Sequence, residues 1–536
     1  MSEVSISDYL LTHLQRGGPV PMNRQLYALL RDGILNRAIQ PGLQVPPTRA
    51  LAADLGVSRN TVTYAYDQLI AEGYLEARTG DGTYVADTEP NMARLSAAAP
   101  ARPKATRSAA GTTVARMASG TVAGGVARGA TTGSAADDAV GAAIDSGAGS
   151  ALSSRGARLL SGTGASSAQW GAFMPGIPDI TRFPHAVWSK LQARHWRRIA
   201  PALLTYGDGA GYPPLREAIA GHLRTARAVN CTADQVIVTS GTHQSIQLAA
   251  TLLGEAGDTA WVEDPCYWGT RNVIRSSGLT PLPLPVDAEG MQLPEEALRT
   301  PPRFIFVTPS HQYPLGPVMS LARRRLLLEY AARHNVWVVE DDYDSEFRYS
   351  GPPLASLQGL DSNERVIYLG TFSKTLFPGL RIGFMVVPAA LAPRFARANA
   401  ELFRDGQSFL HAVLADFINE GHFSSHVRKM RQLYAERLAC LQAAIRVELG
   451  DTATISGSDA GLHLALGLPA GTNDVAISQA ARERGILTRP LSAYYADPAN
   501  AKPGLMLGYA AVPTENIPML FAELAKDIRA QVNVCA

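Results

Sequence analysis

Five short apolar segments alternate with amphipathic segments in the second half of the chain, and this alternation limits the fold more than any other feature. The apolar segments are residues 235–239, 259–262, 303–307, 336–340 and 366–369. Segments with helical periodicity, such as 244–253 and 321–334, lie between them. Continuous apolar strands separated by helices are typical of a mostly parallel sheet covered on both faces. We therefore predict an α/β domain whose ligands lie beyond the carboxyl ends of its strands.

Polar motifs follow these predicted strands. Gly241 and Thr242 come after the first strand and open a helix, where backbone amides and the helix dipole suit a phosphate. Tyr267 comes after the second strand and offers a ring that can stack on a flat ligand, although such a tyrosine can equally belong to the core. Asp341 comes after the fourth strand, and a carboxylate there can keep a pyridine nitrogen protonated.

The stretch after the fifth strand, residues 370–383, contains Lys374 between small and hydroxyl-bearing residues. A partly desolvated lysine has a lowered pKa and becomes a nucleophile toward carbonyl groups. Thr371, Ser373 and Arg381 add two hydroxyls and a guanidinium, which suit a phosphate. A lysine alone on such a loop is usually a surface residue. A phosphate loop, an aromatic ring, a carboxylate and a lysine in this order indicate a site for pyridoxal 5'-phosphate (PLP).

The N-terminal residues 22–86 have the pattern of a helix, a helix-turn-helix and a hairpin. Thr48 is expected to cap a short helix over residues 49–55, and Gly56 to make the tight turn after it. Ser58 is expected to cap a longer helix over residues 59–72, whose first turn is polar. Two short strand-like segments then flank a glycine-rich tip, which predicts a wing.

Residues 45–87 closely resemble the winged helix-turn-helix of GntR-type bacterial regulators. The resemblance implies that operator DNA is contacted by Arg49, Ser58, Arg59, Asn60, Thr61, Arg78 and Gly80. Up to residue 86 the chain has seven arginines and no lysine against eight acidic residues, so attraction to phosphates must be local. Thr63 stands where some relatives carry a further DNA-contacting arginine. The alternative is a winged helix that makes only protein contacts.

The motifs at residues 308–316, 340–349, 370–383 and 426–438 resemble fold-type I aminotransferases and, with the GntR-like segment, the MocR/GabR subfamily of regulators. The resemblance implies that Lys374 forms the internal aldimine with PLP and that Asp341 pairs with its pyridine nitrogen. It implies that Tyr343 hydrogen-bonds the ring hydroxyl and that Tyr267 stacks on the ring. The implied phosphate ligands are Gly241, Thr242, Ser373, Arg381 and, from the neighbouring subunit, Tyr206. A homodimer is therefore expected, and it suits two-fold DNA sites.

One position departs from the aminotransferase pattern. Met506 stands about where aminotransferases carry an arginine for the substrate carboxylate. Arg489 is a possible substitute, but the sequence favours a solvated or structural role for it. The departure argues against ordinary amino-acid transamination. His422 and His426 have helical spacing without a nearby motif acid, so we interpret them as packing residues rather than metal ligands.

We therefore divide the chain into a GntR-like winged helix-turn-helix domain (1–86, α+β), a disordered Ala/Gly/Ser-rich linker (87–168) and an aminotransferase-like PLP-binding domain (169–536). The last domain is expected to end in a smaller α+β subdomain. No apolar run is long enough to cross a membrane, and residues 1–15 lack the pattern of a secretory signal. Four scattered cysteines indicate neither a disulfide framework nor a zinc site and fit a reducing cytoplasm.

The sequence leaves three functions open and favours the first of them. The first is a cytoplasmic, PLP-dependent, DNA-binding transcriptional regulator that senses an amine effector or PLP itself through Lys374. The second is an active aminotransferase that carries a DNA-binding domain. The third is a winged helix used for dimerisation, without an operator. The same scaffold hosts catalysis and sensing, so the fold does not decide between them.

Overall fold

The structure is a computed structural model. It describes residues 6–14, 22–35, 38–71, 74–78, 82–86, 153, 156, 170–349, 355–404, 407–457 and 459–535. Almost all of the predicted linker (87–168) and the predicted DNA contact Gly80 lie outside these residues.

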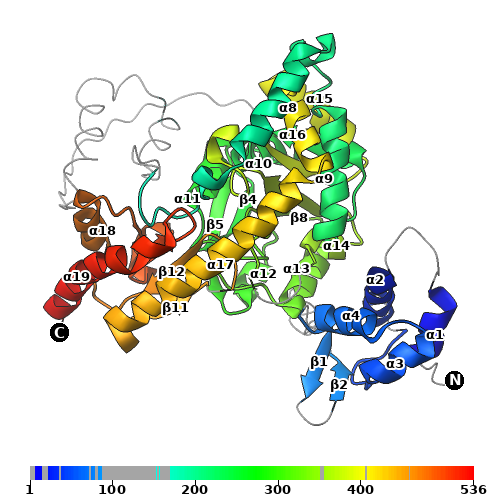
Figure 1. The fold of residues 1–536 in the computed structure, drawn as a ribbon, viewed down its shortest axis with the longest axis horizontal. Helices are drawn as coiled ribbons and strands as arrows, with labels where there is room; N and C mark the ends of the chain where they lie inside the picture. Colours follow the sequence, from blue (N-terminus) through cyan, green and yellow to red (C-terminus); the bar gives the residue numbers. More distant parts are fainter. Residues whose placement is uncertain are drawn as a thin grey trace, which may run out of the picture.

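The N-terminal domain has its own hydrophobic cluster, built by the helices and the hairpin that the sequence predicts (Figure 1). Its elements are α1 (Ile6–His13), α2 (Met22–Leu35), α3 (Thr48–Leu55), α4 (Arg59–Ala71), β1 (Leu75–Arg78) and β2 (Gly82–Val85). Gly56 ends α3 with a left-handed backbone (φ 60°), as expected for the turn. The Ser58 hydroxyl accepts a hydrogen bond from the Thr61 amide at 3.2 Å, which confirms the predicted cap.

The prediction that Thr48 caps α3 is wrong. Thr48 is the first residue of the helix, and Pro47 occupies the cap position without a side-chain hydrogen bond. The physical reason is Pro47: it has no backbone N–H, and its ring fixes φ. It therefore holds the non-helical conformation just before the helix, and Thr48 becomes the first helical residue.

The large domain is built on an eight-stranded sheet with the order β3-β10-β9-β8-β7-β4-β5-β6. Its strands are β3 (Val236–Thr239), β4 (Thr259–Asp264), β5 (Thr280–Asp287), β6 (Gly290–Met291), β7 (Phe304–Val307), β8 (Trp337–Asp342), β9 (Val366–Thr371) and β10 (Gly383–Val386). The run from β5 to β9 is parallel, whereas β10 and β6 pair antiparallel with their neighbours. The mostly parallel sheet is confirmed, and each of the five predicted segments forms a strand. Residues 340–342, expected to follow the fourth strand, are its last residues.

Helices cover both faces of this sheet (Figure 1). They are α8 (His185–Arg197), α9 (Pro213–Ala226), α10 (Thr242–Leu253), α11 (Trp268–Ser276), α12 (Glu295–Leu298), α13 (Leu321–His334), α14 (Leu357–Leu360), α15 (Ala392–Phe403) and α16 (Ser408–Asn419). Successive residues of β3 belong to different clusters: Val236 and Val238 pack in one and Ile237 in another. This two-residue period explains why strands buried on both faces read as continuous apolar runs.

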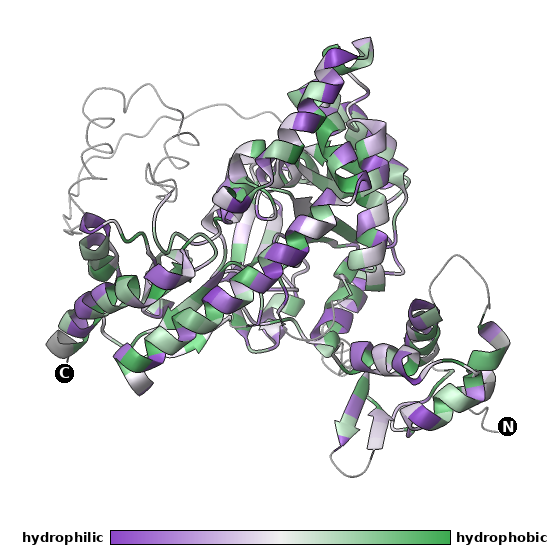
Figure 2. Cartoon of the chain, viewed as in Figure 1, coloured by the Kyte–Doolittle hydropathy of each residue, from purple (hydrophilic) through white to green (hydrophobic). Residues whose placement is uncertain are grey.

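The C-terminal subdomain is joined to the large domain by α17 (His422–Leu449), which crosses the molecule in Figure 1. Its antiparallel sheet has the order β11-β12-β14-β13, formed by β11 (Thr454–Ser456), β12 (His463–Gly467), β13 (Arg489–Pro490) and β14 (Gly504–Gly508). The helices α18 (Asp474–Glu483) and α19 (Ile517–Cys535) pack beside α17 and the sheet. Figure 2 shows hydrophobic and hydrophilic residues alternating along α17, as expected for a helix with one face on a core.

Among the helices of the described residues, none is both long enough and apolar enough to cross a bilayer.

The antiparallel sheet with α17, α18 and α19 confirms the predicted smaller α+β subdomain.

Candidate cofactor site and DNA-binding surface

A cavity opens at the carboxyl ends of the central strands, and nearly all of the predicted cofactor residues line it. Its lining consists of Gly241, Thr242, His243, Tyr267, Thr308, Tyr313, Asp341, Tyr343, Thr371, Ser373, Lys374 and Arg381. Tyr206 is the one predicted cofactor residue that is not part of it. His243, Thr308 and Tyr313 were not predicted as site residues. The signals for them were the motif at residues 308–316, which contains Thr308 and Tyr313, and the place of His243 directly after Thr242.

Lys374 is held in this cavity by one hydrogen bond. Its Nζ atom donates to the Gly176 carbonyl oxygen at 2.8 Å. Burial lowers the pKa of the amine, and the negative charges of Asp344 and Asp341 oppose that shift. The net shift increases the fraction of neutral amine, which is the form that attacks a carbonyl. Gly176 has φ 73°, a backbone conformation that favours glycine, and a Cβ atom there would lie 2.9 Å from Nζ and displace the amine.

Asp341 lacks a partner for one of its carboxyl oxygens. Its Oδ1 atom is fully buried and accepts no hydrogen bond from any described residue. Burial, followed by the charge of neighbouring Asp342, raises the pKa of Asp341 to about 7. A buried carboxylate without a partner is unfavourable, so this position is suited to a cationic donor supplied from outside the chain.

Behind Asp341, a set of buried polar residues fixes the end of β8. The Tyr343 hydroxyl lies 3.0 Å from His311 Nδ1, and that nitrogen lies 3.1 Å from Asp344 Oδ2. On the other side of the strand, Arg227 Nε donates to Asp342 Oδ2 at 2.7 Å. These contacts orient the side chains of β8 before any ligand binds. The sequence showed none of them, because they join residues far apart in the chain.

The loop that opens α10 also lines the cavity. Gly241 has φ 122°, and a Cβ atom at this residue would lie 3.7 Å from the Arg381 guanidinium nitrogens. Arg381 itself adopts a left-handed backbone (φ 52°), a conformation that is uncommon for a residue with a side chain. The geometry leaves room for an anion between the first amides of α10, Ser373 and the guanidinium of Arg381.

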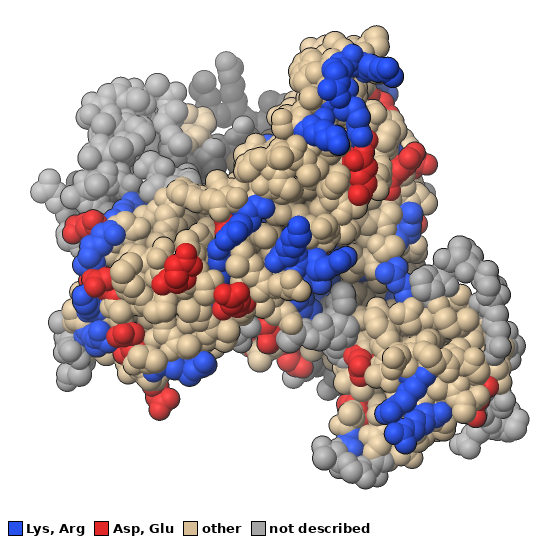
Figure 3. All heavy atoms as spheres, in the orientation of Figure 1, with Lys and Arg blue, Asp and Glu red and all other residues tan. Residues whose placement is uncertain are grey.

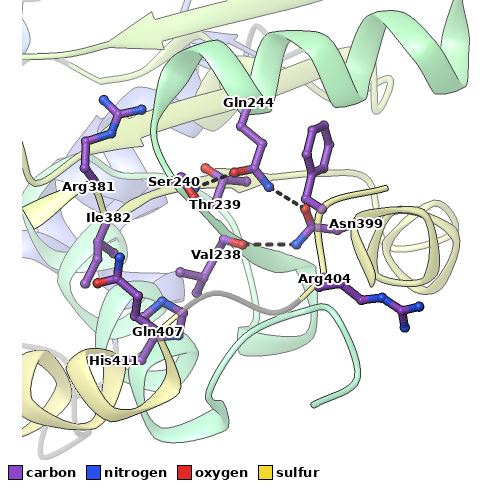
Figure 4. A pocket seen from close by; sticks show the side chains of 11 residues that line it. Val238, Thr239, Ser240, Gln244, Arg381, Ile382, Asn399, Arg404, Gln407 and His411 are labelled. Carbon is purple, nitrogen blue, oxygen red and sulfur yellow. Dashed lines mark hydrogen bonds between the residues drawn. The ribbon is translucent and has the colours of Figure 1, made fainter. Parts of the chain in front are cut away.

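A second layer of hydrogen bonds supports this loop from behind (Figure 4). The Gln244 Oε1 atom accepts from the Ser240 amide at 2.8 Å, and Gln244 Nε2 donates to Asn399 Oδ1 at 2.7 Å. Asn399 Nδ2 in turn donates to the carbonyl oxygen of Gly209 at 2.7 Å. In Figure 4 the Arg381 side chain points away from this network, so its donors are not used by it.

The residues present fit PLP on three observations of this structure. The cavity contains a lysine whose pKa is lowered, a buried carboxyl oxygen without a partner, and an anion cradle without a Cβ atom at Gly241. Tyr267 also lines the cavity and provides an aromatic ring for stacking on a planar ligand.

The protonation of Asp341 gives a testable expectation for the cofactor-free protein. Because its pKa is raised on folding, the folded state binds more protons than the unfolded state between about pH 4 and pH 7, and stability falls as pH rises through that window. We expect Asp341→Asn to raise the unfolding temperature relative to wild type at pH 8 and to change it little at pH 4. Thermal unfolding of both cofactor-free proteins at the two pH values tests this. An equal difference at both values would contradict it.

Tyr206 lies away from the cavity and is 75% exposed. The guanidinium of Arg404 lies over its ring, 5.6 Å from the centroid. Its loop is fixed by the Asn399 bond to Gly209, which also belongs to the network behind the phosphate cradle. An exposed ring on an anchored loop is compatible with the predicted contact to a neighbouring subunit, which stays a prediction.

The predicted DNA contacts that the structure describes lie on α3, at the start of α4 and on β1 of the N-terminal domain. Arg49, Ser58, Arg59 and Asn60 are exposed, and Thr61 is half-buried. Arg78, on the hairpin, is exposed and its guanidinium lies 4.4 Å from the ring centroid of Tyr84. Figure 3 shows basic side chains together on the face of this domain that carries α3. The expected basic patch is thus small and local.

Within the described part of the chain, no group of three or more His, Cys, Asp or Glu side chains is arranged to hold a metal ion. His426 is buried, and its ring lies 6.1 Å from that of Phe183. This contact agrees with the packing role predicted for it.

Comparison with known proteins accounts for both domains. Residues 22–85 match the family "Bacterial regulatory proteins, gntR family", and residues 180–524 match "Aminotransferase class I and II". The probable rhizopine catabolism regulatory protein MocR of Rhizobium meliloti is 41% identical over 499 residues, which cover 93% of this chain and 92% of that protein. The chain belongs to the MocR-type regulators. In this family a GntR-type DNA-binding domain is fused to an aminotransferase-class domain.

Two further comparisons support the family and the fold. The HTH-type transcriptional regulator TauR of Rhodobacter capsulatus is 30% identical over 525 residues, covering 96% of this chain and 98% of that protein. Among solved structures, the α-aminoadipate aminotransferase LysN of Thermus thermophilus, complexed with N-(5'-phosphopyridoxyl)-L-leucine, has 27% identity and a TM-score of 0.63. That match covers 74% of this chain and 99% of LysN. The predicted fold-type I aminotransferase fold of this MocR-type chain is therefore confirmed.

Proposed function

We propose that this protein is a PLP-dependent transcriptional regulator that senses an amine effector at Lys374 and changes its affinity for operator DNA in response. The observation that carries the proposal is that Lys374 and the unpartnered Oδ1 atom of Asp341 lie in one cavity. The same chain has an exposed N-terminus on its predicted recognition helix. A cofactor site and a DNA-reading surface in one chain are the two parts that a ligand-controlled regulator requires.

Each site residue has a defined task in this proposal. PLP supplies an aldehyde that condenses with primary amines. Lys374 provides the amine of the protein, Asp341 holds the pyridine nitrogen, and Tyr343 lies beside the ring hydroxyl. Tyr267 covers the ring face. The phosphate is bound by the cradle of Gly241, Thr242, Ser373 and Arg381.

A homodimer completes this proposal. We propose that Tyr206 contacts the phosphate bound by a second subunit, and its exposure on an anchored loop supports this. A dimer also presents two winged helices to a two-fold operator. The protein then acts in the cytoplasm, where its DNA lies.

The test is binding of the purified protein to DNA from its own upstream region at fixed salt, with and without PLP, against scrambled DNA of the same length. We expect saturable binding that prefers the upstream DNA and that shifts when PLP and a responsive amine are added together. An effector shifts operator affinity only as far as its affinity differs between the two protein states. Equal binding to both DNAs under all conditions would contradict the proposal.

The alternative is an active aminotransferase with a DNA-binding domain, which the intact cofactor cavity favours. Repeated transfer of amino groups from a donor to a keto acid, measured over many turnovers per protein, distinguishes it. Turnover together with operator binding insensitive to amines would favour this alternative.

A further inference from the structure

The C-terminal sheet contributes an apolar cluster that packs against Tyr313, a lining residue of the Lys374 cavity. Met506, on β14, is fully buried. It packs in a cluster with Ala465 and Tyr494, and Tyr313 of the cavity packs against the same cluster. Met506 therefore offers no charge or hydrogen bond to a ligand that enters past Tyr313.

The neighbouring strand supplies a charge beside this position. Arg489, on β13, is the direct cross-strand partner of Met506. Directly opposed residues of an antiparallel pair place their side chains on the same face, with Cβ atoms about 4.5–5.5 Å apart. The guanidinium therefore projects from the face of the sheet that carries Met506, one strand away.

The surroundings of Arg489 show that this face is next to the cavity. Its positive charge acts against the burial-driven rise in the pKa of the hydroxyls of Tyr267, Tyr313 and Tyr494. Tyr267 and Tyr313 line the Lys374 cavity, and the hydroxyls of Tyr313 and Tyr494 lie 3.1 Å apart. Arg489 thus lies close enough to these tyrosines to interact with them electrostatically.

Arg489 is half-buried, and its guanidinium has neither an ion-pair nor a hydrogen-bond partner among the residues that the structure describes. By contrast, the buried guanidinium of Arg271 donates to the Tyr494 carbonyl oxygen at 2.8 Å. A partly buried guanidinium loses hydration without a compensating anion, which favours a site for an external acid group.

We propose that Arg489 binds the carboxylate of the effector, so that the effector is a primary amine that also carries an acid group. This inference rests on the proposed function, because it assigns the ligand class of the same cavity. The amine end enters toward Lys374, while the acid end passes Tyr267 and Tyr313 and meets the planar donor fork of Arg489. In aminotransferases an arginine at about the position of Met506 on β14 binds the substrate carboxylate. Here Arg489 on the adjacent strand β13 takes that role.

The test compares acids with their uncharged amides on the full-length, PLP-loaded protein. The probes are glycine, β-alanine and γ-aminobutyrate, each paired with its carboxamide, and binding is measured by calorimetry and by the shift in affinity for upstream DNA. We expect wild type to prefer at least one acid over its amide by about tenfold or more, as for a charge-assisted hydrogen-bonded pair. We expect Arg489→Gln to remove this preference by weakening the acid and leaving the amide nearly unchanged.

Two controls keep the outcome interpretable. Arg446→Gln changes an exposed arginine of α17 in the same subdomain and should leave the preference intact. Thermal unfolding and retained PLP absorbance show whether Arg489→Gln is folded and loaded. Arg489→Lys keeps the charge without the fork and should retain only part of the preference.

The results also distinguish this inference from the function on which it rests. If amines bind the wild-type protein with no acid preference, or if Arg489→Gln keeps that preference, the assignment of Arg489 is wrong while amine sensing stands. If no probe amine binds or alters DNA affinity, both are overturned.

Discussion

Replacing Lys374 by alanine is expected to abolish both the covalent retention of PLP and the response of DNA binding to amines. The Lys374 Nζ atom lies in the cavity at 2.8 Å from the Gly176 carbonyl oxygen. Burial lowers the pKa of this amine, so more of it is in the neutral form that attacks a carbonyl. We expect borohydride treatment followed by denaturation and mass spectrometry to show PLP fixed on the wild-type chain and none on the variant. Operator affinity of the variant should be unchanged by any amine.

The variant should remain folded. Removing the Lys374 amine leaves the Gly176 carbonyl oxygen without this hydrogen bond. An unsatisfied buried acceptor lowers the free energy of unfolding by about 1–3 kcal/mol. Lys429→Ala, at an exposed position of α17, is the matched control and should keep both PLP fixation and the amine response. Fixation of PLP on Lys374→Ala at the wild-type level would place the reactive lysine elsewhere.

The cofactor cavity was largely predictable because its residues come from the ends of consecutive strands. Gly241, Tyr267, Asp341 and Lys374 each follow or end a continuous apolar strand, and parallel strands bring their carboxyl ends to one edge of the sheet. Local pattern alone therefore placed them together. Their individual roles toward PLP were implied by the family resemblance, and they remain predictions that the Lys374 and Asp341 variants test.

The contacts that orient these residues were not predictable. Arg227 and Asp342 are 115 positions apart, and only the packing of α9 and its following loop against the sheet brings them together. The left-handed backbone of Arg381 is likewise invisible in the sequence, because arginine has no preference for it and tertiary contacts must impose it. The lack of an acidic partner for the Arg489 guanidinium was also not predictable, because it depends on how the acidic residues are arranged in the folded chain.

The strand β5 was also missed, for an identifiable reason. Its sequence contains Pro281, Pro283 and Pro285, and proline argues against a strand. The strand pairs with β4 on one side and with only the two-residue β6 on the other. Because the prolines occur at every second residue, their missing donors all face the same, nearly unpaired side.

Replacing Arg59 by alanine is expected to lower the affinity for upstream DNA by about 10- to 100-fold, as for the loss of a base contact. Arg59 is exposed and is the first residue of α4, directly after the Ser58 cap, at the end of a helix that enters the major groove in helix-turn-helix proteins. Its loss should weaken binding to scrambled DNA much less. Fluorescence anisotropy with both DNAs, at several salt concentrations, measures the two affinities.

The control for Arg59 is Arg24→Ala, an exposed arginine on α2 of the same domain, which should leave operator affinity nearly unchanged. Arg59→Lys preserves charge but not the bidentate fork, so it separates phosphate attraction from base recognition. If Arg59→Ala weakens both DNAs equally and only flattens the salt dependence, Arg59 contacts phosphate and the sequence is read elsewhere on α3, α4 or the hairpin. If neither affinity changes, the exposed N-terminus of α4 is not the DNA-reading surface, and the third possibility, a winged helix used only for protein contacts, gains support.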